Sequence, residues 1–288
     1  MNPLLNMLLG KNDLPVLPDI IAHISKKLSD PDSTIEEIAG LIQTEPVLTG
    51  NIIRLSNTVL FGGQADIRDL KNAVVRIGMN EIKNMVYSVE MLQVFKDNPV
   101  IDQKMFWRHS LAVAMCAQFL SKTLGGDKVL QEASYTAGLM HDMGILVYAY
   151  LAPKSYEQFL KKNWAYLTPG KEFYELHFLE KKSFDLHHAE LGAAYIEAWW
   201  PIDELVISAV AGHHSKFSEY EEIPDIVKYV SFANKYCNSK EVHNGVQRVK
   251  IDLTDSDYET INLSDDKMLL FQERAQMAID MAEAMISF

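Results

Sequence analysis

The chain has 288 residues, of which 48% are hydrophobic and 23% are charged, and its net charge is −12. This composition is typical of a globular protein with a sizeable core, and it argues against a nucleic-acid binder, which needs clustered Lys and Arg. No apolar run reaches the ~20 residues of a membrane-spanning helix, and the N-terminus lacks the basic start of a signal peptide. We therefore expect a cytoplasmic protein that binds neither membranes nor nucleic acid, with Cys116 and Cys237 as core thiols.

The first hundred residues predict a series of helices, because apolar residues recur at three- and four-residue intervals. Ser33 or Thr34 can cap one of them, since Glu36 and Glu37 fall in the turn that follows. The predicted helices cover residues 18–28, 35–42, 47–55 and 81–95.

A linker is predicted between residues 94 and 103, where helical periodicity stops and Asn98-Pro99 interrupts the chain. No pair of apolar strands joined by a tight turn is found on either side. We predict an all-α fold, with an N-terminal helical bundle subdomain over residues 1–98 and a second helical subdomain over residues 99–288.

One acid stands alone in an apolar segment of the second part. Between residues 133 and 153 the only charged side chain is Asp142, with His141 beside it as the only group able to take up a proton. A segment this apolar is expected to be buried, and a buried carboxylate is strongly destabilising unless a cation, a metal ion or several donors face it. The partners of Asp142 therefore point to the function.

Histidines on the apolar faces of other helices are the candidate partners. A helix over residues 103–124 carries His109 on its apolar face, and a helix that begins near His187 carries His188 on its own. The stretch DELVISAVAGHH brings His213 to the apolar face of a further helix, with His214 next to it.

Each histidine taken alone has a simpler explanation. A single inward histidine is usually a core side chain with one hydrogen-bond partner, and a helix C-terminus favours imidazolium at His213-His214. His23, His177 and His243 are expected on the surface or in loops. Several imidazoles around one acid leave many ring nitrogens that need a partner. One or two ions of Fe, Ni, Zn or Mn would coordinate them together. An imidazolium paired with Asp142 would satisfy the same charge without metal, so both arrangements remain open.

The order and spacing of His109, His141-Asp142, His188 and His213-His214 resemble the HD superfamily of metal-dependent phosphohydrolases, which is named for that doublet. The stretches that begin at LPVLPDII and at LKNAVVRIG also resemble the opening helices of HDOD proteins, the HD-related output domains of bacterial signalling. The resemblance covers residues 14 to about 238 and leaves a C-terminal helical extension over residues 262–288. It implies an HD-like second subdomain, a regulatory protein partner, and a metal site to which Asn234 also contributes.

Three departures from this pattern concern catalysis. Asn234 stands where active HD hydrolases have an aspartate, and it brings an oxygen without a charge. Ile145 replaces a lysine of the related HD-GYP cyclic-dinucleotide phosphodiesterases, and no Gly-Tyr-Pro follows His214. The resemblance thus implies a signal-transduction output module with no or residual phosphohydrolase activity. The alternative is an active metal-dependent phosphohydrolase acting on a phosphoester or nucleotide, with Asp142 as its catalytic residue.

The C-terminal extension is expected to form one more helix. Its apolar residues can pack on the body of the protein, which we favour, or pair with a second copy in an oligomer. These residues are Met268, Leu269, Met277, Ile279, Met281 and Met285.

Overall fold

The computed structural model describes residues 2–10, 14, 23–24, 26–28, 30, 32–58, 61, 66–94, 99–170, 172–200, 202–215 and 223–286. None of these residues lies in a β-strand, so the predicted all-α fold is confirmed. No helix in the described part of the chain is both long and apolar enough to cross a membrane. Most of the helix predicted over residues 18–28 lies outside the described residues.

The chain divides into two compact units. One holds Met1–Leu14 with Asp97–Ser287, and the other holds Pro15–Lys96. The predicted boundary at residue 98 placed the first residues with the N-terminal part, whereas helix α1 (Pro3–Gly10) packs on helices α9 and α12 of the first unit. Two apolar side chains of α1, Leu4 and Leu8, are buried.

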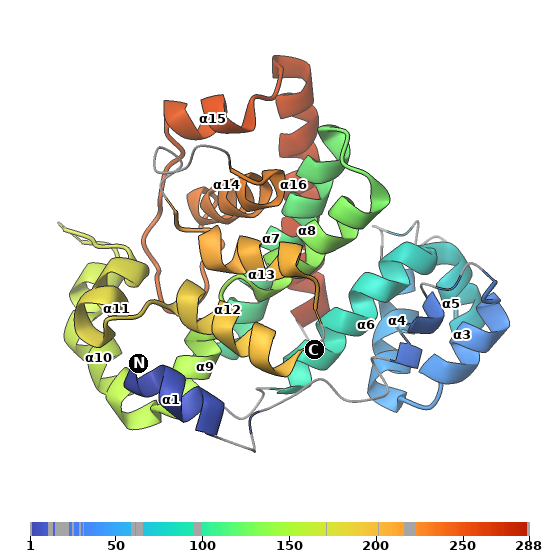
Figure 1. Ribbon diagram of the computed structural model, residues 1–288. Helices are drawn as coiled ribbons and strands as arrows, with labels where there is room; N and C mark the ends of the chain where they lie inside the picture. Colours follow the sequence, from blue (N-terminus) through green and yellow to red (C-terminus); the bar gives the residue numbers. More distant parts are fainter. Residues whose placement is uncertain are drawn as a thin grey trace. The chain divides into compact units, whose positions relative to one another are not determined.

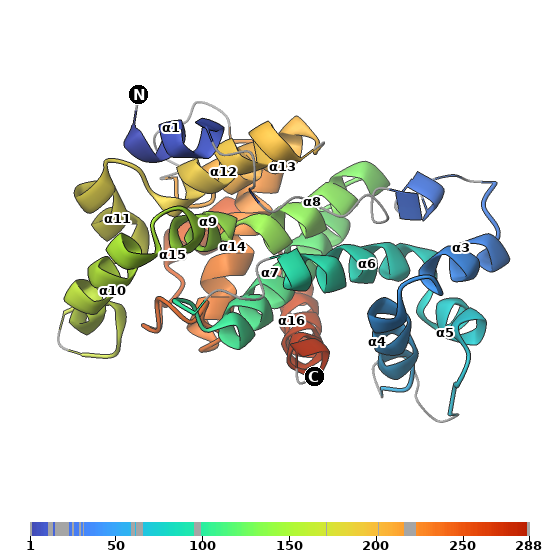
Figure 2. The ribbon, with the colours of Figure 1, turned by 90° about the horizontal axis from the view of Figure 1, so that it is seen from below.

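Residues 15–96 form a small helical unit of their own. Thr34 begins helix α3 with a capping box, because its hydroxyl accepts from the backbone N–H of Glu37 while Glu37 accepts from the backbone N–H of Thr34. Figure 2 shows these helices side by side, and their contacts join α3 to α4 and α5, and α6 to α4 and α5. They are α3 (Ile35–Ile42), α4 (Pro46–Ser56), α5 (Leu70–Ile77) and α6 (Met79–Val94).

Helix α7 (Gln103–Thr123) is the centre of the larger unit. It begins at Asp102, whose carboxylate accepts from the backbone N–H of Met105, and it packs on helices α8, α14 and α16 (Figure 1). Cys116 of α7 and Cys237 of α14 are free, buried thiols in contact with each other. The other helices of this unit are α8 (Lys128–Met140), α9 (Met143–Leu151), α10 (Pro153–Leu167), α11 (Leu176–Phe184), α12 (His188–Trp199), α13 (Glu204–Gly212), α14 (Asp225–Ser239), α15 (Asp255–Ile261) and α16 (Asp265–Ile286).

Glycines let the helices that carry the site approach one another closely. A Cβ atom on Gly144 of α9 would lie 1.8 Å from the carbonyl oxygen of His188 and 2.8 Å from the backbone nitrogen of Gly192. A Cβ atom on Gly138 of α8 would lie 2.7 Å from the Cα atom of Ala114 in α7. Since no side chain fits at either position, α9 meets α12 and α8 meets α7 at backbone distance.

The C-terminal helix packs on the body, as favoured from the sequence, but through a different set of residues. Helix α16 contacts α7, and Phe271 lies against the rings of Phe119, Phe232 and Tyr236. Of the predicted stripe, Met285 is buried, whereas Leu269 and Met277 are exposed. The buried face consists of Phe271, Ala275, Ala278, Ala282 and Met285.

Candidate metal centre

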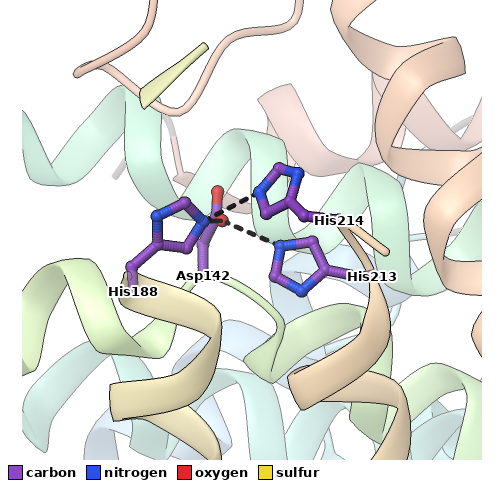
Figure 3. Close-up of side chains that lie close together, drawn as sticks. All are labelled: Asp142, His188, His213 and His214. Carbon is purple, nitrogen blue, oxygen red and sulfur yellow. Dashed lines mark hydrogen bonds and ion pairs between the residues drawn. The ribbon is translucent and has the colours of Figure 1, made fainter. Parts of the chain in front are cut away.

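The ends of four helices and the middle of a fifth bring the predicted residues to Asp142. His141 follows the last turn of α8, Asp142 precedes the first turn of α9, and His188 opens α12. His213 and His214 follow α13, and His109 projects from the middle of α7. Figure 3 shows His188, His213 and His214 around the carboxylate.

Each oxygen of the Asp142 carboxylate faces its own group of imidazoles. Oδ2 lies 3.3 Å from Nε2 of His141 and 3.7 Å from Nε2 of His109. Oδ1 lies 3.3 Å from Nε2 of His188 and 3.7 Å from Nε2 of His213, and Nε2 of His214 lies 2.9 Å from Nε2 of His188. Two groups of possible metal ligands therefore share one carboxylate.

In three of these histidines, the ring nitrogen that faces Asp142 is an acceptor when the ring is neutral. Nδ1 of His109, His141 and His213 lies 2.6 to 2.8 Å from the backbone carbonyl oxygens of Val242, Gly138 and Val210. Each Nδ1 therefore donates its hydrogen, which leaves a lone pair on Nε2.

These lone pairs call for a cation. Nε2 of His109 lies 3.2 Å from Nε2 of His141, although neither can donate to the other, and Nε2 of His213 is buried without a hydrogen-bond partner. Two ligands held about 2.1 Å from one ion at tetrahedral to trigonal angles lie roughly 3.4 to 3.6 Å apart. The distances from the imidazole nitrogens to Asp142 fit that spacing, so the donor set suits a divalent transition metal.

A buried carboxylate behind His188 fixes the orientation of its ring. Glu180 of α11 accepts from the backbone N–H of His188, and the same oxygen lies 2.6 Å from Nδ1 of His188. The hydroxyl of Tyr156 donates to the other oxygen of Glu180 at 2.7 Å. A carboxylate that holds the outer nitrogen of a histidine is a common feature of metal sites.

An asparagine from the loop after α14 also reaches the carboxylate. Nδ2 of Asn244 donates to Oδ2 of Asp142 at 2.8 Å, and Val242 of the same loop accepts from His109. Asn234 is buried on α14, where its amide oxygen accepts from Nδ2 of Asn238 at 2.8 Å. The role of Asn234 as a metal ligand stays a prediction.

Without an ion, the charges in the cluster are divided unevenly. Burial lowers the pKa of His109 and of His213 to about 4, and it also lowers the pKa of His214. Burial opposes the charge on His188 as well, but Glu180 and Asp142 raise its pKa to about 10. Burial would raise the pKa of Asp142, yet the surrounding histidines, His141 above all, hold it well below its ordinary value. An imidazolium at His188 is thus the metal-free partner of Asp142.

A pocket of about 680 Å³ borders the cluster on one side. His213 and His214 line it together with two lysines, Lys181 and Lys235. Each lysine is paired with a carboxylate, Lys181 with Glu190 and Lys235 with Asp257. The pocket gives a small molecule access to the side of the cluster formed by His213 and His214.

Several residues of this environment were not predicted from the sequence. Glu180 has a detectable signal, since it is an acid four residues from both Leu176 and Phe184 on the apolar side of a helix. The only sequence signal at Asn244 is an Asn-Gly pair in a polar loop. His177, expected on the surface or in a loop, is buried in the first turn of α11, and His243 is buried in its loop.

The departures related to catalysis are in part visible. Ile145 is fully buried in α9, so the position of the missing lysine belongs to the core. The segment after Ser215, where Gly-Tyr-Pro would follow, falls largely in residues 216–222, outside the described residues.

The fold and the cluster define an all-α protein with a buried His/Asp site whose residues could hold a metal ion. The family model of the HDOD domain matches residues 14–216, and the chain therefore belongs to the HDOD family. The match ends at residue 216, before the predicted end of the resemblance at about residue 238. A protein of Treponema pallidum (strain Nichols), described as uncharacterized, is 28% identical over 223 residues, which are 77% of this chain and 42% of that protein. The chain thus spans less than half the length of this relative.

Solved structures share the fold at low sequence identity. An HDOD domain protein of unknown function from Geobacter sulfurreducens has a TM-score of 0.78 at 24% identity, over 98% of this chain and 97% of that chain. A "putative phosphohydrolase" from Shewanella amazonensis has a TM-score of 0.73 at 19% identity, over 99% and 98%. A "putative signal transduction protein" from Marinobacter aquaeolei has a TM-score of 0.72 at 16% identity, over 96% and 60%.

Proposed function

We propose that this chain is a cytoplasmic regulatory module of bacterial signal transduction whose His/Asp cluster binds one or two divalent transition-metal ions. The main observation in favour of metal binding is the set of Nε2 lone pairs directed at Asp142. One of them, on His213, is buried without a hydrogen-bond partner. A structural polar cluster without a metal ion would direct hydrogen-bond donors, not acceptors, at a carboxylate. A regulatory protein partner is part of this proposal and is inferred from the family.

Each of the two ligand groups that share Asp142 would hold one ion. His109 and His141 would serve one position, and His188, His213 and His214 the other. Imidazole with a single carboxylate favours Fe, Ni, Zn or Mn over Mg or Ca. Asn234 remains a candidate for an additional oxygen ligand.

Low or absent turnover is expected. A bound ion would supply an activated water and polarise a phosphoryl oxygen. The position shortly after the doublet, from which a lysine could bind a phosphate, is occupied here by the buried Ile145. An active phosphohydrolase remains the second candidate, because the pocket beside His213 and His214 carries Lys181 and Lys235 on its wall.

Elemental analysis and turnover assays on one preparation test both candidates. Protein purified without chelator should contain about one or two ions per chain, and His141→Ala should lose most of this metal. We expect no hydrolysis of generic phosphoesters or of cyclic di-GMP above background with Mn, Fe or Ni supplied. Turnover that disappears in Asp142→Ala would establish the enzyme instead. A metal-free protein whose melting temperature ignores added Zn, Ni, Mn and Fe at pH 7.5 would contradict the metal site itself.

A further inference from the structure

We propose that Glu175, His177 and His214 form a further site for a divalent transition-metal ion, which lies beside the Asp142 cluster and has His214 in common with it. One donor atom from each of these residues lies within 4.8 Å of the others. Glu175 and His177 have no part in the proposed function, so substitutions of these two residues test this site separately from the Asp142 cluster.

The distance between Glu175 and His177 suits two ligands of one ion. Nδ1 of His177 lies 3.6 Å from Oε2 of Glu175, which is longer than a hydrogen bond. Two ligands about 2.1 Å from a common ion, with about 120° between them, are roughly 3.6 Å apart. The two atoms are therefore spaced for an ion between them and not for direct contact.

The nitrogen of His177 that faces Glu175 lacks any other use. His177 is only 9% exposed, and its Nδ1 is buried without a hydrogen-bond partner. The ring stacks on His214 with 4.2 Å between centroids and 19° between planes. The two rings are neighbours, but their lone pairs are nearly parallel, so one ring must rotate before both bind the same ion. A buried ring nitrogen without a partner is unfavourable, and an ion would satisfy it.

The side chain of Glu175 is free to act as a metal ligand, because it does not cap the helix that it precedes. It occupies the N-cap position of α11, but its side chain makes no capping hydrogen bond. The backbone around it is held separately, because the N–H of Leu176 donates to Oε1 of Gln247 at 2.6 Å. The carboxylate thus stays available without being needed for the start of the helix.

Two histidines and one carboxylate define the class of ion and leave room for a further ligand. This donor set binds Zn or Fe(II) in proteins and leaves at least one coordination position open. All three residues line the pocket of about 680 Å³, together with Lys181 and Lys235. The open position is therefore suited to water or to an anionic oxygen, such as that of a phosphate or carboxylate.

Sharing His214 predicts that the new site is the weaker one. Figure 3 shows one ring nitrogen of His214 directed at His188 and Asp142 and the other directed away. A neutral imidazole carries one lone pair, so His214 serves one ion at a time. When the Asp142 cluster is filled, the further ion would rely on Glu175, His177 and water.

Metal titration of the full-length protein tests this site. Metal-free protein is titrated with Co²⁺, and bound ion is measured by equilibrium dialysis with elemental analysis and by visible absorption. Wild type should bind one equivalent more than His177→Gln, and Glu175→Gln should weaken the last equivalent by about tenfold or more. His187→Gln is the matched control, because His187 lines the same pocket, also with a buried and unpartnered Nδ1, but belongs to no group of three ligands.

The outcomes separate this site from the Asp142 cluster. If His177→Gln and Glu175→Gln bind as many ions as wild type with the same affinities, the further site does not exist. Loss of one equivalent in His177→Gln but none in His141→Ala would support the further site and contradict the proposed cluster. Melting curves check that each variant is folded, and the partly exposed Glu175 provides the variant that is safer for folding.

Discussion

Asp142 is an aspartate at the start of a helix that does not cap it. It occupies the N-cap position of α9, yet its side chain accepts no hydrogen bond from the first turn. The carboxylate is turned instead to the histidines and to Asn244, and it is only 1% exposed. Its conformation is therefore set by the cluster, and a substitution here should affect ion binding more than helix formation.

Replacing Glu180 by Gln should weaken metal binding by about 10- to 100-fold without removing a ligand. The neutral amide polarises His188 less than a carboxylate does, although its size is the same. Isothermal titration with Zn²⁺ measures the change. Tyr156→Phe removes only the hydroxyl that donates to Glu180 and should have a smaller effect. Equal affinities in Glu180→Gln and wild type would show that this carboxylate is structural.

The metal-free protein should lose stability as the pH falls from about 6.5 to about 4. Unfolded histidines titrate near 6.5, whereas burial lowers the pKa of His109 and His213 to about 4 in the folded protein. In this window the unfolded state binds more protons, so acid favours unfolding, by up to about 1.4 kcal/mol per pH unit for each group. Urea unfolding of chelated protein at several pH values gives the slope. His213→Gln should reduce that slope, and an unchanged slope would be evidence against the prediction.

At the scale of the elements, the contact between α9 and α12 decides whether the site forms. Gly144→Ala would place a methyl group 1.8 Å from the carbonyl oxygen of His188, which must move away from Asp142. We expect a loss of at least about 2 kcal/mol in unfolding free energy and a large loss of bound metal. Chemical denaturation and elemental analysis measure the two effects.

Gly50→Ala is the matched control for that change. Gly50 lies in α4, and a Cβ atom there has no neighbour within 4 Å. This substitution should leave metal content unchanged and stabilise the helix slightly, by up to about 1 kcal/mol. A folded Gly144→Ala protein with full metal content would disprove the importance of the close approach.

Helix α16 should be an integral part of the larger unit. Phe271→Ala removes a fully buried ring that contacts Phe119, Phe232 and Tyr236, and it should lower the free energy of unfolding by about 3 to 5 kcal/mol. Leu269→Ala, at a side chain that is 60% exposed, should change it by less than about 0.5 kcal/mol. Similar values for both variants, measured by urea unfolding, would mean that α16 is only loosely attached.

At the scale of the whole molecule, metal should stabilise one unit and not the other. Every proposed ligand lies in the unit that contains residues 97–287, and the unit over residues 15–96 has its own buried core. At a free ion concentration 1,000 times the Kd, binding adds about 4 kcal/mol to the stability of the binding unit. Hydrogen exchange should therefore rise after chelation in peptides from α7, α8, α12 and α13. Peptides from α3 to α5 should show no change, and a comparable rise there would contradict this assignment.

The sequence predicted local features well and distant contacts poorly. The helices over residues 35–42 and 103–124 agree with α3 and α7, and His109 and His188 were found because each lies on the apolar face of its own helix. Asn244 could not be found in this way, since it meets Asp142 from 102 residues away through a loop without periodicity. The packing stripe of α16 was misjudged because its buried face is mostly alanine, which carries a weak hydrophobic signal.

The unequal burial of the two ligand groups has a consequence for the kinetics of exchange. His109, His141 and Asp142 are at most 1% exposed, and so are His188 and His213, but His214 is half-buried and lines the pocket beside His213. An ion held on the Oδ2 side of the carboxylate can leave only after the protein opens locally or after the ion on the Oδ1 side has gone. Chelation should thus proceed in two phases, with a fast release from the pocket side and a slow release limited by opening of the helix ends. The more enclosed ion would be acquired as the chain folds and would be retained for as long as the cluster stays closed.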